Sequence, residues 1–219
     1  MLKVGLTGGI AVGKSVVGEM FVAHGAHLVQ ADHIAHELMQ PGEKVYDQVV
    51  QRFGREILNP DRTVNRAQLA QIAFATAPDG KSRIEELNRI VHPVVIARQD
   101  EWMEEIGRQD PGAVAIVEAA LIIEAGASKH FDRLIVVTCR PDQRVARFAA
   151  RQKISLEAAR VEVARRMAAQ LPDEEKIKAA DYVIDNSGPL ENTEARVREM
   201  WAILGRAANP DSQTRSPHD

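Results

Sequence analysis

The sequence predicts an α/β fold with three layers, in which helices cover both faces of a parallel five-stranded sheet. Two observations lead to this fold class. Five short apolar runs are separated by helical patterns along a chain of 219 residues, and strands of this kind are typical of parallel sheets buried on both faces. A glycine-rich loop with a lysine stands between the first apolar run and the first helical pattern. The chain is 45% hydrophobic, which is enough to bury a sizeable core.

The amino-terminal part alternates between strands and helices. Leu2–Thr7 is predicted to be a short buried strand, and residues 14–24 a helix with one apolar face. His27–Gln30 is predicted to be the second strand. A helix is expected to start near Asp32, which could be its N-cap or could lie in its first turn.

Residues 40–108 are predicted to form a helical insertion. Apolar residues recur there at helical spacing in three sets: Val45, Val49 and Phe53; Leu69, Ile72 and Ala73; Ile84, Leu87 and Val91. Pro93 is expected either to kink this region or to open a new helix that reaches about residue 106.

Three further apolar strands complete the predicted sheet, at residues 113–119, Arg133–Thr138 and Tyr182–Asp185. A second, basic helical excursion is predicted between the last two. The expected organisation is a core of residues 1–39, 109–139 and 181–204, the insertion at 40–108, the basic segment at 140–180 and a disordered tail at 205–219.

Composition excludes several classes of protein. A formal net charge of −3 argues against a general nucleic-acid binder, and the apolar runs are too short to span a bilayer. Cys139 is the single cysteine, so no internal disulfide can form, and its apolar surroundings indicate a buried small side chain. We therefore expect a cytoplasmic monomer with neither a nucleic-acid nor a membrane partner.

The glycine-rich loop fits a phosphate-binding pattern. Gly8, Gly13, Lys14 and Ser15 match G-x-x-x-x-G-K-[ST] between a predicted strand and a predicted helix, which is the context that this motif requires. Glycines let successive backbone N–H groups turn inward around an anion, and the helix amino terminus adds partial positive charge. Lys14 would bridge the terminal phosphates of a nucleotide, and Ser15 would offer its hydroxyl to Mg²⁺. The alternative is a glycine-rich turn with a surface lysine.

The residues around this loop favour a kinase. A GTPase would need an Asn-Lys pair to read guanine, and the chain has none. A strand that ends in Glu118 is a weak candidate for the magnesium anchor of a motor or transport ATPase. Asp32 follows the second strand, where a kinase carboxylate could accept the proton of an attacking hydroxyl. Simple helix capping by Asp32 is the alternative.

The basic segment could supply the cations that phosphoryl transfer needs. Residues 140–166 carry eight basic and three acidic side chains. Arg144, Arg147 and Arg151 recur at three and four residues, so they share a helix face. We expect a lid that closes over the nucleotide, excludes water and brings guanidinium groups to the phosphates. A solvated charged helix face is the alternative.

With these motifs in place, the sequence resembles the dephospho-CoA kinase family from about residue 2 to residue 201. LTGGIAVGKS resembles the phosphate loop of the family, ADHIAHELMQPG its acceptor-side segment, NRAQLAQIAF and the His92-Pro93 pair its substrate domain, and EAALIIEAG the acceptor pocket. QRVARFAAR with AAQLPDEEK resembles the lid, and ADYVIDNSG the adenine-side strand and loop.

The resemblance implies ATP and Mg²⁺ as cofactors and dephospho-CoA as the acceptor, phosphorylated on its ribose 3'-hydroxyl in the last step of coenzyme A synthesis. It implies that Asp32 is the acid/base residue and that Ser15 holds the metal. The ATP contacts that it implies are Gly9, Ile10, Ala11, Val12, Gly13, Lys14, Ser15, Val16, Asn186 and the lid residues Arg140, Arg144 and Arg147. The acceptor contacts that it implies are Asp32, His92, Leu121 and Glu124.

Several positions depart from the pattern of the family. Ala11 and Val12 replace a common Gly-Ser pair, which should be tolerated if only their backbone N–H groups act. Gln30, His36 and Ala120 stand where Asp, Arg and Pro are frequent. Two other functions remain open: a kinase for a different hydroxyl metabolite or a nucleoside monophosphate, and a nucleotide-binding regulator without a small-molecule acceptor.

Overall fold

The computed structural model describes residues 1–74 and 83–209 of the chain. These residues form two compact units. Within the described ranges, the first consists of residues 1–30 and 102–209, and the second of residues 31–74 and 83–101. The first unit contains the sheet and the phosphate loop, and the second is helical.

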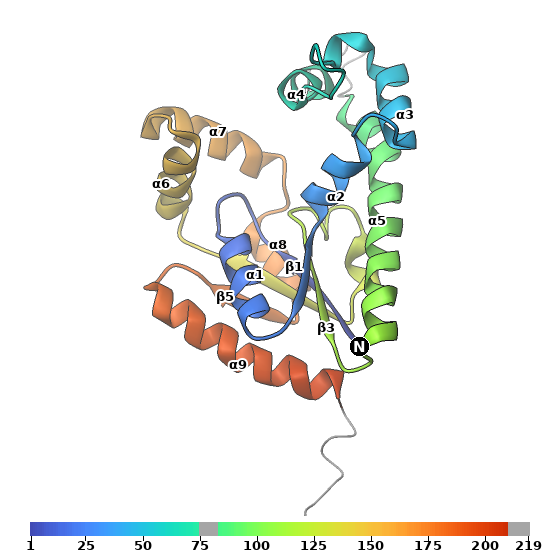
Figure 1. Ribbon diagram of the computed structural model, residues 1–219. Helices are drawn as coiled ribbons and strands as arrows, with labels where there is room; N and C mark the ends of the chain where they lie inside the picture. The colour runs from blue at the N-terminus through green and yellow to red at the C-terminus, as the bar shows by residue number, and fades with distance from the viewer. Residues whose placement is uncertain (75–82, 210–219) are drawn as a thin grey trace, which may run out of the picture. The chain divides into compact units, whose positions relative to one another are not determined.

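The sheet of the first unit has five parallel strands in the order β2-β3-β1-β4-β5 (Figure 1). The strands are β1 (Leu2–Thr7), β2 (His27–Gln30), β3 (Val114–Glu118), β4 (Arg133–Thr138) and β5 (Tyr182–Asp185). The central strand, β1, pairs with β3 on one side and β4 on the other, with Leu6 opposite Glu118 and Thr7 opposite Val136. The carboxyl ends of all five strands therefore meet at one edge. The predicted parallel sheet is confirmed, with β3 one residue shorter at each end than expected.

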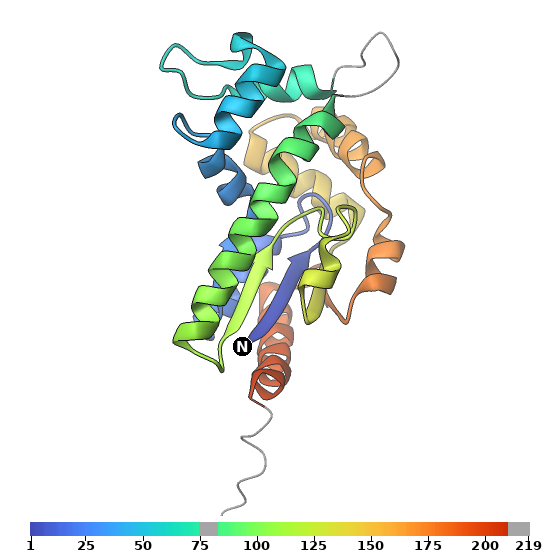
Figure 2. The ribbon, with the colours of Figure 1, turned by 90° about the vertical axis from the view of Figure 1, so that its right-hand side faces the viewer.

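Helices cover the two faces of this sheet. On one face, α1 (Lys14–Ala23) and α9 (Leu190–Ala208) pack side by side on the strands. Their buried side chains, among them Phe21 and Met200, form the main core with Leu6 and Ile135. On the other face, the last turns of α5 (Ile84–Gln109) run alongside β3 (Figure 2). Met103 of α5 packs there with Ala115 and Val117. The three predicted layers are confirmed.

The basic segment forms three helices and belongs to the same unit as the sheet. They are α6 (Pro141–Gln152), α7 (Leu156–Ala168) and α8 (Asp173–Ala179), and a short 3-10 helix, η2 (Ala127–His130), precedes them in the chain. Pro141 opens α6, where a missing N–H costs nothing. The Ser155 hydroxyl caps α7 by accepting a hydrogen bond from the Ala158 N–H at 3.2 Å. Between α6 and α7, Phe148 and Val163 pack with Ile10 of the phosphate loop.

The second unit consists of α2 (Ala31–Leu38), α3 (Lys44–Phe53), a 3-10 helix η1 (Arg55–Ile57), α4 (Arg66–Phe74) and the first part of α5. The apolar face predicted for α3 is confirmed, because Val45, Val49 and Phe53 are all buried. The Arg83 guanidinium lies 4.4 Å from the centre of the Phe53 ring.

Two predictions about helix ends need correction. Pro93 lies inside α5, so the alternative in which it opens a new helix is wrong. Val91 and Val95 are buried on either side of it, and this packing offsets the cost of about 3 kcal/mol for an interior proline. The last helix, α9, continues to Ala208, so residues 205–208 are helical although the sequence places them in the tail. Residues 210–219 of the predicted tail lie outside the described residues.

In the described part of the chain, no helix combines the length and the apolar character needed to cross a membrane.

Candidate functional site

The phosphate loop turns tightly between β1 and α1. Gly8 has φ 149° and Gly13 has φ 93°, and α1 begins at Lys14, directly after Gly13. A Cβ at Gly8 would overlap the carbonyl oxygen of Val137, and a Cβ at Gly13 would overlap the side-chain amide of Asn186. Both positions therefore require glycine for backbone conformation and for space. The loop wraps an amino-terminal helix end, which is the arrangement that binds phosphate.

Ala11 also adopts a left-handed conformation, with φ 56°. This conformation costs an L-residue about 1–2 kcal/mol that glycine avoids. The sequence predicts that an alanine is tolerated here if only its backbone acts. In the structure the Ala11 side chain lines the edge of a pocket, where it has room. The free-energy cost of alanine at this position therefore comes from its backbone conformation.

Lys14 and Ser15 face the loop and the end of β3. Lys14 Nζ donates hydrogen bonds to the carbonyl oxygens of Gly8 and Gly9, both at 3.1 Å. Ser15 Oγ donates to Glu118 Oε1 at 2.8 Å. Glu118 is 8% exposed and ends β3, whose neighbour β1 leads into the loop. A hydroxyl and a carboxylate thus lie together where two strands end, and these are donors that Mg²⁺ prefers.

Arg144 of α6 is buried against the loop. Its side chain is 1% exposed, and a Cβ built on Gly9 would lie 2.6 Å from its Nη1. Its Nη2 forms an ion pair with Asp173 of α8 and donates to the Cys139 carbonyl at 3.5 Å. Its Nε and Nη1 have no hydrogen-bond partner among the described residues. Buried donors of a cation are normally satisfied, so the site fits an anion beside Gly9.

Arg147 and Asn186 hold the same carbonyl group of the loop. Arg147 Nη1 donates to the Val12 carbonyl at 3.2 Å, and Asn186 Nδ2 donates to it at 2.9 Å. Arg147 Nη2 also donates to the Asn186 carbonyl at 2.9 Å. The Thr193 hydroxyl fixes the Asn186 side chain by donating to its Oδ1 at 3.0 Å. These contacts tie α6 and the loop after β5 to the phosphate loop.

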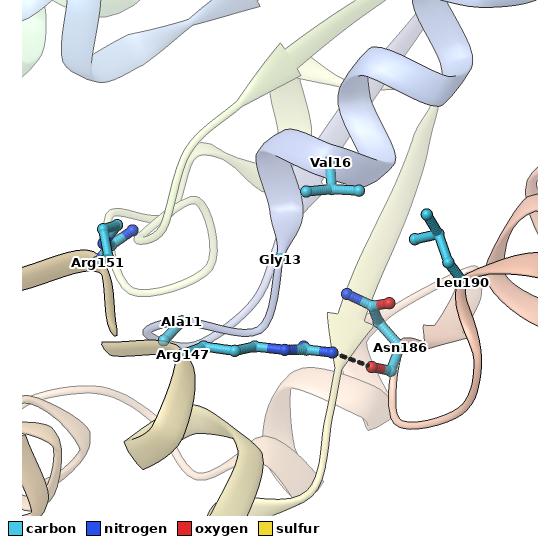
Figure 3. Close-up of a pocket in the computed structure, with 7 residues that line it drawn as sticks. All are labelled: Ala11, Gly13, Val16, Arg147, Arg151, Asn186 and Leu190. Carbon is cyan, nitrogen blue, oxygen red and sulfur yellow. Dashed lines mark hydrogen bonds between the residues drawn. The ribbon is translucent and has the colours of Figure 1, made fainter. Parts of the chain in front are cut away.

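A pocket of about 390 Å³ opens beside Arg147 and Asn186 (Figure 3). Its volume is within the range for small-molecule sites. In Figure 3 the Arg147 side chain lies extended along the pocket, and its guanidinium reaches Asn186. The residues that line the pocket are Ala11, Gly13, Val16, Arg147, Arg151, Asn186 and Leu190.

Cys139 and Arg140 follow β4 and differ in their surroundings. Arg140 precedes α6, its side chain is mostly exposed, and its Nε lies 3.4 Å from Asp142 Oδ1. Cys139 is buried, with its Sγ 3.9 Å from the Ala11 carbonyl oxygen. Burial raises the pKa of the Cys139 thiol, and the nearby guanidinium of Arg144 opposes this rise. The predicted role of this cysteine as a buried small side chain fits these surroundings.

The turn after β3 carries Leu121 and Glu124. Leu121 is half-buried, and its carbonyl accepts a hydrogen bond from the Ala125 N–H at 2.9 Å. Glu124 Oε1 pairs with the Lys176 ammonium at 2.8 Å and accepts the Leu171 N–H at 3.1 Å. The Lys176 side chain is 0% exposed. This turn is therefore fixed to α8 by a buried ion pair.

Asp32 and His92 belong to the second unit. Asp32 is exposed in the first turn of α2, so of the two placements predicted for it, the first turn is confirmed. His92 is half-buried in α5, and burial lowers the pKa of its imidazole. The roles of both residues stay predictions.

Sequence reasoning missed three residues that shape the site: Asp173, Lys176 and Thr193. Asp173 lies 29 residues from its partner Arg144 and Lys176 lies 56 residues from Ala120, whereas Thr193 lies seven residues from Asn186. The only sequence signal was the segment AAQLPDEEK, in which a proline precedes an acidic turn. That signal predicts a helix start but gives no partner for the charges.

The chain is similar to known proteins over most of its length. The family model described as dephospho-CoA kinase matches residues 2–192. A curated dephospho-CoA kinase of Streptomyces avermitilis is 41% identical over 211 residues, which cover 96% of this chain and 98% of the relative. A curated dephospho-CoA kinase of Geobacter metallireducens is 40% identical over 201 residues, which cover 92% of this chain and 96% of the relative. A crystal structure of a Thermus thermophilus protein matches with a TM-score of 0.73 at 30% identity, covering 93% of this chain and 97% of that one.

The family match spans most of the chain, including the loop, the turn after β3, the basic segment and Asn186. Both curated relatives are dephospho-CoA kinases, and the similarity covers nearly their whole length. The chain belongs to the dephospho-CoA kinase family.

Proposed function

We propose that this protein transfers the terminal phosphoryl group of ATP to the ribose 3'-hydroxyl of dephospho-CoA, giving coenzyme A and ADP. Membership of a kinase family supports the reaction. The observation that carries the proposal is the phosphate loop, in which Lys14 lies over the loop and the buried Arg144 presents two donors without partners beside Gly9. These donors match the charge of a triphosphate.

In this proposal the loop from Gly9 to Val16 holds the β- and γ-phosphates with its backbone N–H groups. Lys14 exchanges its contacts with the Gly8 and Gly9 carbonyls for phosphate oxygens. Arg144, held in place by Asp173, neutralises charge that develops on the transferred group. Arg140, at the start of α6, approaches the phosphates from solvent.

The pocket beside Asn186 is proposed to hold the base of ATP. The Arg147 guanidinium lies along this pocket and is fixed by two carbonyl groups, so it offers a flat cationic surface to a base. Asn186 shapes the pocket through its hold on the Val12 carbonyl. Arg147 then acts on the nucleotide through the base and the loop.

The donor set at the end of β3 fits Mg²⁺. The Ser15 hydroxyl and the Glu118 carboxylate are 2.8 Å apart and are oxygen ligands, as this cation requires. Ser15 and Glu118 would hold the ion, which supplies charge neutralisation to the phosphate oxygens when bound. Glu118 was only a weak candidate in the sequence.

The acceptor is proposed to contact Asp32, His92, Leu121 and Glu124. Asp32 orients or deprotonates the 3'-hydroxyl. The insertion at residues 40–108 supplies the acceptor-binding domain, and the basic segment at 140–180 acts as the lid. Cytoplasm and a monomeric state stay the expectations of the sequence.

The proposal is tested by incubating the protein with ATP, Mg²⁺ and dephospho-CoA and detecting coenzyme A by mass spectrometry. Shikimate, gluconate and nucleoside monophosphates serve as alternative acceptors in a coupled ADP-release assay. We expect transfer to dephospho-CoA alone. Transfer to another acceptor, or hydrolysis of ATP without any acceptor, would overturn the assignment.

A further inference from the structure

Lys176 of α8 is a fully buried cation whose three N–H donors all have acceptors. Its Nζ lies 2.8 Å from Glu124 Oε1, 3.4 Å from the Ala120 carbonyl and 3.5 Å from Gln170 Oε1. Its side chain is 0% exposed. A buried lysine is expensive to desolvate and persists only with such a partner set. The Lys176 ammonium therefore fixes the turn after β3 through its contacts with Glu124 and the Ala120 carbonyl.

The two carboxylate oxygens of Glu124 differ. Oε1 is held by Lys176 and by the Leu171 N–H at 3.1 Å. Oε2 is buried and has no hydrogen-bond partner among the described residues. An acceptor left in this state costs free energy that a ligand donor would recover. The geometry thus leaves one oriented carboxylate oxygen ready for a hydroxyl or amide N–H.

The same network reaches the phosphate loop by two routes. The Ala120 carbonyl accepts a second hydrogen bond, from Thr7 Oγ1 at 3.3 Å, and Thr7 is the residue directly before Gly8. One turn before Lys176 in α8, Asp173 forms the ion pair with Arg144. One short helix therefore anchors the turn that bears Glu124 and the arginine beside Gly9.

We propose that Lys176 is a positioning residue for the phosphoryl acceptor: it holds Glu124 so that Oε2 accepts a hydrogen bond from a hydroxyl or amide N–H of that acceptor. The inference rests on the proposed function, because it needs an acceptor with such a donor. The ammonium also offsets the charge of Glu124, which lets a carboxylate lie beside an anionic substrate. Lys176 itself touches no substrate.

The test compares Lys176→Met with Lys178→Met. Both changes remove a lysine from α8, but the Lys178 side chain is 71% exposed and pairs with Glu175 at the surface. For Lys176→Met we expect kcat/KM for dephospho-CoA to fall about 10- to 100-fold, the range for a displaced contact, while KM for ATP changes less than about twofold. Lys178→Met should match the wild type in both constants.

A purely structural role would give a different result. Thermal unfolding would occur at a lower temperature, the active fraction would fall, and KM for each substrate in the surviving enzyme would equal that of the wild type. An equal rise in KM for both substrates would likewise overturn the proposal.

The double variant Glu124→Gln/Lys176→Met keeps the test valid if Lys176→Met alone fails to fold, because it removes both buried charges together. If Lys176 acts through Glu124, the double variant should have the same KM for dephospho-CoA as Glu124→Gln alone. A further multiplicative rise would contradict the inference.

The wild-type control separates this inference from the proposed function. If the wild type forms no coenzyme A, the proposed acceptor is wrong whatever the variants do. If the wild type forms coenzyme A and Lys176→Met has the same kcat/KM for dephospho-CoA, the proposed function stands and the positioning role is refuted.

Discussion

Asn186 donates its side-chain amide to the main-chain carbonyl of Val12, 2.9 Å away and 174 residues earlier in the chain. The Asn186 side chain is buried, and its Oδ1 accepts a hydrogen bond from the Thr193 hydroxyl. This hydrogen bond joins the loop after the last strand to the loop after the first. The shape of the proposed base pocket therefore depends on one amide group.

Asn186→Asp should damage nucleotide binding. The change places a carboxylate oxygen against the Val12 carbonyl, so two acceptors face each other in a buried site, at a cost of about 1–3 kcal/mol. We expect KM for ATP to rise about 10-fold or more while KM for dephospho-CoA stays unchanged, as measured by steady-state kinetics. Asn192→Asp, at an exposed position of α9, is the control and should behave as the wild type. If KM for ATP were unchanged in Asn186→Asp, the Asn186 amide would not shape the base pocket as proposed.

Gly9→Ala should displace Arg144 from the phosphate loop. The new Cβ would lie 2.6 Å from Arg144 Nη1, and the buried guanidinium is tethered to Asp173. We expect kcat/KM for ATP to fall by about 10-fold or more. Gly205→Ala is the matched control: a Cβ there meets nothing within 4 Å, and in helix α9 it should stabilise the protein by about 0.5–1 kcal/mol. If Gly9→Ala had wild-type kinetics, the proposed phosphate contact of Arg144 would be wrong.

Asp32→Asn should separate binding from chemistry. The amide keeps the shape of the side chain but cannot accept the proton of the attacking hydroxyl, so we expect kcat to fall about 10²- to 10⁴-fold with nearly unchanged ATP affinity. Asp47→Asn alters an exposed carboxylate in the first turn of α3, the same kind of position, and should leave turnover intact. Full activity in Asp32→Asn would reduce this residue to a helix-terminus charge.

His92 should make stability depend on pH in a defined direction. Burial lowers the pKa of its imidazole in the folded protein, so between that pKa and the unfolded value of about 6.5 the unfolded chain binds more protons. The contribution of His92 is therefore fully present above about pH 6.5 and is lost as the pH falls toward the folded pKa. NMR titration should give a His92 pKa below about 6.5, and His92→Gln should flatten the pH dependence of unfolding. His33→Gln, at an exposed position of α2, is the control. A His92 pKa above 6.5 would reverse the sign and contradict the prediction.

The sequence predicted the sheet almost residue for residue because its signals are local. Leu2–Thr7, Arg133–Thr138 and Tyr182–Asp185 are short, mainly apolar runs, and a buried parallel strand needs nothing more specific. The phosphate loop was equally clear, since its function depends on the spacing of a few neighbouring residues. Pro93 was harder, because its cost to a helix is local while the burial of Val91 and Val95 that offsets it is tertiary.

The candidate site was only partly predictable for the same reason. Spacing on α6 places Arg144 and Arg147 on one face, but their neighbours differ: Arg144 lies beside Gly9 with two donors without partners, while Arg147 donates to two carbonyl groups. Glu118 meets Ser15 only because β3 pairs with β1, more than a hundred residues earlier. Local sequence patterns cannot predict contacts between residues so far apart in the chain.

The central place of β1 in the sheet also constrains how the chain is made. Its partners are β3, where Val114 lies opposite Leu2, and β4 beyond it. At a synthesis rate of roughly 5–20 residues per second, the first strand waits roughly 5–20 seconds for a neighbour. During translation the nascent chain therefore exposes the apolar strand β1 and a phosphate loop that lacks its later partners. Helices α2, α3 and α4, which are encoded between β2 and β3, can fold in that interval, since the contacts among them and η1 are short in range.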